Sequence, residues 1–243
     1  MSELWIEKYR PYDFSDIIGQ DTIINSINNM INRKSLPHML FYGNPGTGKT
    51  TTVLTIINKL YNDINNSFFV MKLDASNNRG INTIRNEVKG FAEKKLMFGQ
   101  KIKIIILDEV DSMTDDAQFA LRRIIEQYSD TTRFILICNY VNKIIPAIRS
   151  RCLNFKFKPL THDSIHTKLM TICNKEKLKI NDKYLKLISS LVDGDIRKAI
   201  NVLQTISKIN KVTEKTIYNM IGFPHNAIIK KFINNIYCKK NNL

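Results

Sequence analysis

The run Gly43-Asn44-Pro45-Gly46-Thr47-Gly48-Lys49-Thr50 constrains the fold of this chain more than any other stretch. The apolar run HMLFYG leads into it, and a helix-length amphipathic segment, residues 49–61, follows it. Glycines in such a strand-to-helix turn let backbone N–H groups point at an anion, and the N-terminus of the helix favours negative charge. This context predicts a phosphate-binding loop (P-loop) rather than a glycine-rich turn that only packs.

Two side chains of the loop carry most of its expected chemistry. We expect Lys49 to reach the β and γ phosphates of ATP and the Thr50 hydroxyl to ligate Mg²⁺. The remaining positions are expected to line the same nucleotide site: Gly43, Asn44, Pro45, Gly46, Thr47, Gly48 and Thr51.

The segment around the loop alternates between short β-rich runs and helix-length amphipathic runs, from His38 to about Phe157. The strand candidates are HMLFYG, FFVMKLD, KIIILD, RFILICN and CLNFKF, and the helix candidates are residues 49–61, 81–95 and 115–128. Strands of continuous apolar character separated by helices predict a parallel sheet covered on both faces. We therefore expect a three-layer α/β nucleotide-binding domain over residues 1–159.

Beyond this series the strands stop and apolar residues recur at helical spacing. The clearest set is Ile196, Ala199, Ile200, Leu203 and Ile206. This periodicity predicts helices that bury one face. Because Pro159 interrupts the last strand candidate and Thr161 can cap a helix, we expect a small all-helical domain over residues 160–222.

Two carboxylates follow the apolar run IIIL, at the C-terminal end of a predicted strand, the edge at which open α/β sheets bind ligands. We expect Asp108 to hold Mg²⁺, directly or through water, and Glu109 to orient and polarise the attacking water. Together with the P-loop, this pair predicts an ATPase. Asp111 completes the string DEVD, which is typical of some helicases, but such a helicase needs a second motor domain for which this chain is too short.

Composition adds weaker constraints on partners and compartment. The net charge is +15, and residues 151–243 hold 18 basic but only 6 acidic residues, which weakly favours a polyanionic partner. No signal-peptide pattern or membrane-spanning run is evident, so we expect an intracellular, non-secreted protein. The four cysteines lack paired spacing, which favours reduced and mostly buried thiols over a zinc site or disulfides.

Several motifs, in a fixed order, make a specific resemblance: WIEKYRP, FSDIIGQ, the P-loop, DASNNRGINTIR, LDEVDSMT, CNYVNKIIPAIRSRC and GDIRKAIN. From Leu4 to about Gly222 the chain resembles the small subunits of replication factor C, the sliding-clamp loader of eukaryotes, archaea and large viruses. The resemblance implies an AAA+ ATPase that uses ATP and Mg²⁺ within a hetero-oligomeric pentamer. It also implies that the helical domain, residues 160–222, is the lid of the α/β domain. A further implication is that the complex loads a polymerase clamp onto primer–template DNA, at a nuclear or cytoplasmic replication site.

The resemblance assigns roles to residues outside the P-loop. Asn139 matches sensor 1 and Arg197 matches sensor 2, both of which act on the γ-phosphate region. Arg151, in IRSRC, matches an arginine finger that reaches the ATP of the neighbouring subunit, whereas Arg149 is expected to be structural. The residues that would border adenine are Tyr9, Arg10, Pro11, Ile17 and Ile18.

Two surfaces are expected in the segment after the second strand candidate. Arg79 stands near a helix start, and Arg85 and Lys89 lie one turn apart, a geometry that suits a track of DNA phosphates. Arg122 and Arg123 are weaker candidates because either could pair with Glu126. The family docks its clamp near the end of this helix, where the apolar candidates are Phe91, Leu96, Met97 and Phe98.

The resemblance leaves alternatives open. The family continues past the lid into a helical collar, so residues 223–243 are expected to be the start of a truncated collar or a C-terminal tail. Another AAA+ motor, for branch migration or protein remodelling, is opposed by WIEKYRP and by the SRC motif. A scaffold that binds ATP without hydrolysing it is opposed by the joint presence of Lys49, Asp108 and Glu109.

Overall fold

The computed structural model describes residues 3–61, 68–76, 82, 84–94, 102–209, 212–224, 228–230, 232 and 236, with residues 84 and 85 described in their backbone alone. The chain divides into two compact units, which are an α/β unit of residues 11–159 and a helical unit of residues 160–243 together with residues 1–10. The boundary between the units thus falls after Pro159, and the first ten residues group with the helical unit.

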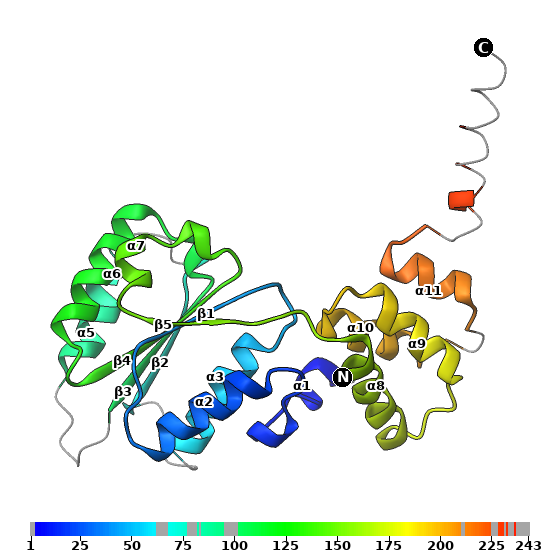
Figure 1. Cartoon of the computed structure of the whole chain (residues 1–243), viewed down its shortest axis with the longest axis horizontal. Coiled ribbons are helices and arrows are strands. Elements are labelled where there is room, and N and C mark those ends of the chain that lie inside the picture. Colours follow the sequence, from blue (N-terminus) through cyan, green and yellow to red (C-terminus); the bar gives the residue numbers. More distant parts are fainter. Residues whose placement is uncertain are drawn as a thin grey trace. The chain divides into compact units, whose positions relative to one another are not determined.

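Five parallel strands form the sheet of the α/β unit, in the order β2-β3-β4-β1-β5 (Figure 1). The strands are β1 (Met39–Tyr42), β2 (Val70–Asp74), β3 (Lys103–Asp108), β4 (Thr132–Cys138) and β5 (Leu153–Lys156). Met39 of β1 lies opposite Ile135 on one side and Leu153 on the other. The predicted parallel sheet is confirmed. Its order brings the C-terminal ends of β3, β4 and β1 next to one another, at an edge typical of ligand binding.

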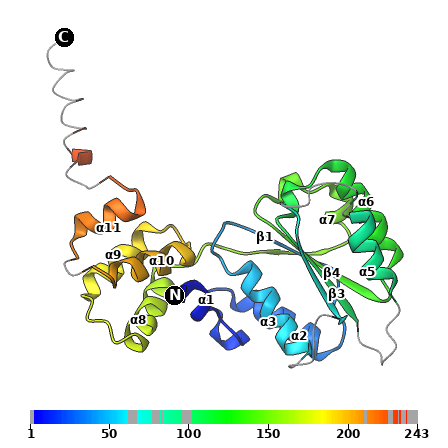
Figure 2. The same cartoon turned by 180° about the vertical axis from the view of Figure 1, so that it is seen from behind.

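Helices cover both faces of this sheet, as Figures 1 and 2 show. One face carries α5 (Lys89–Glu93), α6 (Asp115–Gln127) and α7 (Pro146–Arg149), and the other carries α2 (Asp21–Asn32) and α3 (Lys49–Tyr61). Alternate strand residues enter the two cores: Phe134 packs with the first set of helices, and Phe41 with the second. Burial on both faces explains the nearly continuous apolar strands of the sequence.

Short helical turns connect these elements. They are η1 (Phe14–Asp16), η3 (Ile84–Val88), η4 (Val110–Ser112) and η5 (Val141–Lys143). The η3 segment is π-helical and runs directly into α5, so the predicted helix at 81–95 is not a regular α-helix over the part that the structure describes. Such π-helical turns are rare and often mark functional segments.

The helical unit contains α1 (Trp5–Lys8), α8 (His162–Lys175), α9 (Asp182–Leu191), α10 (Ile196–Ile206) and α11 (Glu214–Ile221). Thr161 caps α8 through the N–H of Ser164, as its residue type predicts. The predicted apolar face of α10 is buried, and the Trp5 N–H donates to Gln204 of that helix at 3.1 Å. Within the described ranges, no helix has the length and apolar character that crossing a membrane requires.

Candidate active site

The P-loop joins β1 to α3 through a turn that only glycine fits at its first position. Gly43 has φ +144°, and a Cβ on it would lie 2.3 Å from the carbonyl oxygen of Phe157. That carbonyl belongs to the segment just after β5, the strand beside β1. The turn is closed further along by the buried Thr47, whose hydroxyl donates to the Asn44 carbonyl at 2.9 Å. The backbone of the loop is therefore fixed by packing as well as by sequence.

Lys49 is the first residue of α3 and is only 7% exposed. Its ammonium donates to the carbonyls of Gly43 at 2.7 Å and Asn44 at 2.9 Å, and to Oδ1 of Asn139 at 3.0 Å. Asn139 follows β4, so this one cation joins the P-loop to the end of a neighbouring strand. The structure thus brings the predicted phosphate-binding lysine and the predicted sensor 1 residue together.

Thr50 and Asp108 form the second contact across the site. The Thr50 hydroxyl donates to Oδ2 of Asp108 at 3.1 Å, which links the start of α3 to the end of β3. Hydroxyl and carboxylate oxygens are the ligands that Mg²⁺ prefers, and Mg²⁺ in nucleotide sites needs only one or two protein ligands besides phosphates and water. These two residues therefore fit a magnesium ion. In the described part of the chain, no cluster of three or more His, Cys, Asp or Glu side chains suggests another metal site.

Glu109 leaves the strand in a conformation that non-glycine residues seldom adopt. Its φ is +55° and ψ is 39°, and its N–H donates to Oδ1 of Asp108 at 3.0 Å. Left-handed residues other than glycine are uncommon and cluster at functional sites, although Lys34, Lys177 and Asp193 of this chain also adopt this conformation. The turn leaves the Glu109 side chain exposed at the same sheet edge as Asp108. A carboxylate placed there can accept a proton from water.

Asp111 has a role that the sequence reasoning missed. Its Oδ2 accepts the backbone N–H of Asn139 at 3.2 Å and that of Tyr140 at 3.0 Å. This carboxylate therefore holds the loop after β4, and with it the Asn139 side chain, against the segment after β3. Its place two residues after Glu109 was visible in the sequence, but the backbone partners were not, since they come from another strand.

Arg151 follows α7, and the structure does not group it with the P-loop residues. Its guanidinium forms an ion pair with Glu126, donates to the Ala147 carbonyl at 2.7 Å and lies 3.5 Å from the Ser150 hydroxyl. The side chain is 36% exposed. Arg149 is less exposed, and its buried Nε has no hydrogen-bond partner within the described structure.

The remaining predicted nucleotide contacts fall in both units. Ile17 is buried in the core beside α2 and Ile18 is partly exposed, whereas Tyr9 and Arg10 belong to the helical unit. The Tyr9 hydroxyl donates to Glu176 at 2.5 Å, and burial together with this bond raises the pKa of Tyr9.

Arg197 lies in the first turn of α10 and is exposed, off the buried face of that helix, as the periodicity predicted. Its backbone N–H donates to Asp195, the cap of the helix, at 2.9 Å. Within the described part of the chain, the Arg197 guanidinium has no ion pair or hydrogen bond.

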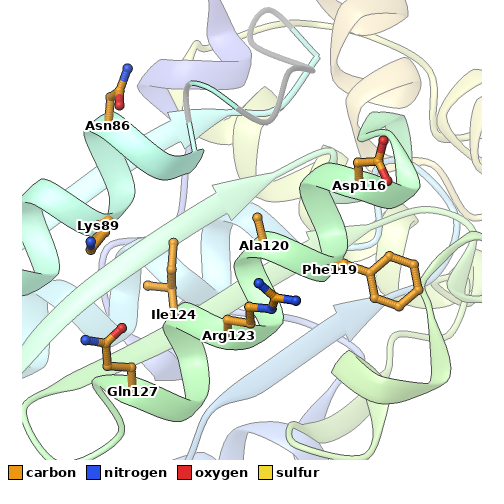
Figure 3. Close-up of a pocket in the computed structure, with 8 residues that line it drawn as sticks. All are labelled: Asn86, Lys89, Asp116, Phe119, Ala120, Arg123, Ile124 and Gln127. Atoms are coloured by element: carbon orange, nitrogen blue, oxygen red, sulfur yellow. The ribbon is translucent and has the colours of Figure 1, made fainter.

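A groove of about 490 Å³ lies between the η3–α5 segment and α6. Figure 3 shows Lys89 on one wall and Phe119 and Arg123 on the other. Lys89 pairs with Glu93 at 3.4 Å, whereas Arg123 makes no hydrogen bond or ion pair with the residues that the structure describes. Arg122, the other arginine of this pair in the sequence, lies 3.8 Å from Glu126.

Several predicted surface residues cannot be placed on this groove. Arg79, Leu96, Met97 and Phe98 lie outside the described residues, and Arg85 is described in its backbone alone, within η3. Phe91, the remaining clamp candidate, is partly buried and packs against the core beneath α5. Of the cysteines, Cys138, Cys152 and Cys173 are buried as expected.

Comparison with known families follows the division of the chain. Residues 39–160 match the AAA family, described as the ATPase family associated with various cellular activities, and residues 162–216 match the RFC1-like AAA+ ATPase lid domain. The chain is 45% identical over 221 residues to replication factor C subunit 5 of Homo sapiens, covering 90% of this chain and 65% of that protein. It is 42% identical over 230 residues to the replication factor C small subunit of Staphylothermus marinus, covering 95% and 70%.

Curated relatives of this kind do not favour the branch-migration or scaffold alternatives. The chain spans 65% of the length of the human protein and of the probable replication factor C subunit 5 of Dictyostelium discoideum, to which it is 47% identical over 90% of this chain. Among solved structures, the Thermotoga maritima RuvB Holliday junction branch migration motor has a TM-score of 0.67 at 18% identity, covering 88% of this chain and 72% of that one. At that identity the likeness concerns the fold alone.

Proposed function

This chain belongs to the replication factor C family of AAA ATPases, and from that premise we propose that it is an ATP-hydrolysing subunit of a sliding-clamp loader. The observation that carries the proposal is the sheet edge where Lys49, Asp108, Glu109 and Asn139 meet, while Arg151 is held elsewhere. A complete hydrolytic set with its arginine placed apart is what a shared, subunit-to-subunit reaction requires.

In this proposal each residue of the edge has one task. The Lys49 ammonium exchanges its two carbonyl acceptors for phosphate oxygens, which bind a cation more strongly. Thr50 and Asp108 would hold Mg²⁺, which when bound neutralises phosphate charge. Glu109 accepts a proton from the attacking water, and Asn139 orients that water or the γ-phosphate.

The residues of the first and last motifs complete the nucleotide site in this proposal. Tyr9, Arg10, Pro11, Ile17 and Ile18 would border adenine; of these, Ile17 is buried in the core beside α2. Arg197 would contact phosphate as sensor 2, a role that its exposed position at the start of α10 supports. In this proposal residues 1–159 form the nucleotide-binding domain and residues 160–222 the lid, with residues 1–10 grouped by their contacts with the helical unit.

Arg151 would supply charge stabilisation to the ATP of an adjacent subunit. Negative charge spreads over the transferred phosphoryl group as it leaves, and an arginine delivered in trans stabilises it there. The support for this role is that the polar partners of Arg151 belong to α6, α7 and the turn after α7, not to the P-loop. The partners implied are other loader subunits in a hetero-oligomeric pentamer, the sliding clamp and primer–template DNA, at a nuclear or cytoplasmic replication site.

DNA would follow the groove of Figure 3 through its phosphates. Arg123 has no ion pair within the described structure, and Lys89, which pairs with Glu93, lies on the facing wall. Two cations therefore line the groove, together with the carboxylate of Asp116. Arg79 and Arg85 would extend this track along the same segment of chain. Phe91, Leu96, Met97 and Phe98 stay as the proposed clamp contact near the end of α5.

Residues 223–243 would contact other subunits, either as part of a collar helix or as a C-terminal tail. Of their described side chains, Ile228, Phe232 and Ile236 are exposed by 61%, 66% and 48% and recur every four residues. Apolar residues at that spacing form one face of a helix, and such a face is stable when another helix covers it.

The ATPase proposal is tested by separating binding from turnover. Lys49→Ala is expected to weaken ATP binding by about 10²-fold or more, because charge-assisted hydrogen bonds to phosphate are lost. Glu109→Gln is expected to keep ATP affinity and to lower kcat by about 10²- to 10⁴-fold. Fluorescent ATP titration and phosphate release, with primer–template DNA and a clamp present, measure the two quantities. Lys59→Ala, on the same helix, is the matched control and should change neither quantity. Equal loss of ATP affinity in Lys49→Ala and Glu109→Gln would contradict the assigned roles.

The DNA surface is tested by salt dependence. Joint replacement of Arg79, Arg85 and Lys89 by alanine is expected to weaken binding to primer–template DNA and to flatten the log–log salt slope by about one unit per lost phosphate contact. A matched triple replacement in the helical unit, at Lys179, Lys183 and Lys186, should leave the slope unchanged. If the first triple variant keeps the original slope, this segment does not contact DNA.

A further inference from the structure

Glu126, in the last turn of α6, is the acidic partner of the proposed finger arginine. Its Oε1 pairs with the Arg151 guanidinium and lies 3.8 Å from Nε of Arg122, one turn earlier on the same helix. One carboxylate thus bridges two arginines that come from segments far apart in the chain.

The contacts of Arg151 fix its guanidinium from two directions. One terminal nitrogen faces the Ala147 carbonyl and the Ser150 hydroxyl, and the other faces Glu126. A guanidinium has five N–H donors in a rigid plane, so the N–H groups that do not face Ala147, Ser150 or Glu126 in the described structure can meet a phosphate.

The charges of the cluster indicate that Glu126 can hold Arg151 in place without cancelling its positive charge. Two guanidinium groups share one carboxylate, so the cluster of Arg122, Glu126 and Arg151 keeps a net charge of about +1. Both partners of the Arg151–Glu126 pair are more than a third exposed. Pairs of this kind add little to folding stability. What the pair does is fix the orientation of the Arg151 guanidinium, because a long and partly exposed side chain would otherwise sample many rotamers.

We propose that Glu126 is a positioning residue for Arg151, holding the guanidinium plane in the orientation in which it meets the phosphate of the neighbouring subunit. This inference rests on the proposed function, since it requires Arg151 to act in trans. A carboxylate that instead competed with that phosphate would restrain hydrolysis, and its removal would raise turnover.

The first measurement uses the isolated chain and needs no neighbour. Phenylglyoxal modifies arginines that are free of partners, and mass spectrometry reads the rate at Arg151. We expect Glu126→Ala to raise this rate several-fold, with an unchanged unfolding midpoint. The matched control is Asp182→Asn, because Asp182 likewise bridges two basic side chains, His166 and Lys186. An unchanged rate at Arg151 in Glu126→Ala overturns the proposal.

The second measurement uses the complex that this chain forms with clamp-loader subunits from the same organism. Glu126→Ala is expected to lower kcat at the neighbouring site about 10-fold with KM for ATP unchanged, because misorientation costs transition-state contact and not substrate binding. Glu126→Asp should restore part of the rate, and Glu126→Ala should have no further effect on top of Arg151→Ala.

The outcomes of the second measurement separate the two proposals. If Arg151→Ala lowers neighbouring turnover but Glu126→Ala leaves it unchanged or raises it, the positioning role is wrong and the trans role stands. If Arg151→Ala itself has no effect in the complex, the trans role fails and the inference about Glu126 fails with it.

Discussion

The P-loop, Gly43–Thr50, and the rim segment, Pro146–Cys152, each carry one cation for which we propose a phosphate contact, but they hold it differently. Lys49 is 7% exposed, and its acceptors on Gly43, Asn44 and Asn139 lie at the C-terminal ends of β1 and β4. The Arg151 side chain is 36% exposed and its acceptors lie on the surrounding helices. In our proposal, the cation for the chain's own nucleotide is therefore fixed by the core of its fold, whereas the cation for a neighbouring subunit is held by surface contacts.

The largest expected effect tests this difference at the rim. Arg151→Ala should lower turnover at the neighbouring site by about 10³-fold, on the order of 4 kcal/mol, because the transition-state charge loses its stabilising partner. The substituted subunit should still bind ATP, since its own phosphate contacts are untouched. Combining the change with Glu109→Gln in one subunit at a time leaves a single competent site for each measurement. A deficit in the substituted subunit's own site would mean that Arg151 acts in cis, as Lys49 is proposed to do, and would contradict the proposed difference between the two regions.

The next effect tests whether the P-loop depends on the core. Gly43→Ala should lower the free energy of unfolding by about 3 kcal/mol, because its Cβ would meet the Phe157 carbonyl oxygen and its φ is strained for any other residue. Gly90, within α5, has no heavy atom near the position of an added Cβ. Gly90→Ala should therefore stabilise the protein by about 0.5–1 kcal/mol. Denaturant unfolding measures both, and a neutral Gly43→Ala would show that the loop is not held by β5.

A smaller effect concerns the strand that carries the P-loop. His38 precedes β1, and its Nδ1 accepts the N–H of Phe134. Burial of the ring, together with the nearby charge of Arg133, lowers the pKa of His38 from 6.5 to about 4. Because the unfolded chain binds the proton more readily, the stability from neutral His38 is full above pH 6.5 and is lost as pH falls toward 4. The loss should be on the order of 2 kcal/mol for a partly buried group.

The control for this pH effect is His38→Asn, which can still accept the Phe134 N–H through its amide oxygen. Unfolding free energies measured at several values between about pH 4.5 and 7 should show a shallower pH dependence in this variant. An identical slope in both proteins would contradict the assignment. The rim segment contains no histidine, so no counterpart is expected there.

Much of the fold and part of the site were predictable because their signals are local. The apolar runs and their spacing predicted five parallel strands and the lid helices. The residue types at the ends of β1 and β3 predicted Lys49, Thr50 and Asp108 as one group, since C-terminal strand ends meet at one edge of a parallel sheet. The π-helical form of η3 was not predicted, because its periodicity differs little from that of an α-helix over five residues.

What only the tertiary structure decided depends on the strand order β2-β3-β4-β1-β5. That order places β4 between β1 and β3, and so brings Asn139 to Lys49 and Asp111 to the loop after β4, across gaps in sequence that no local pattern records. Packing α6 and α7 on the same face gave Arg151 its partner Glu126. The sequence by itself determined which chemical groups the chain offers, because residue type and spacing set local backbone form. Their partners were decided by packing, because a contact between distant segments exists only once the sheet between them is assembled.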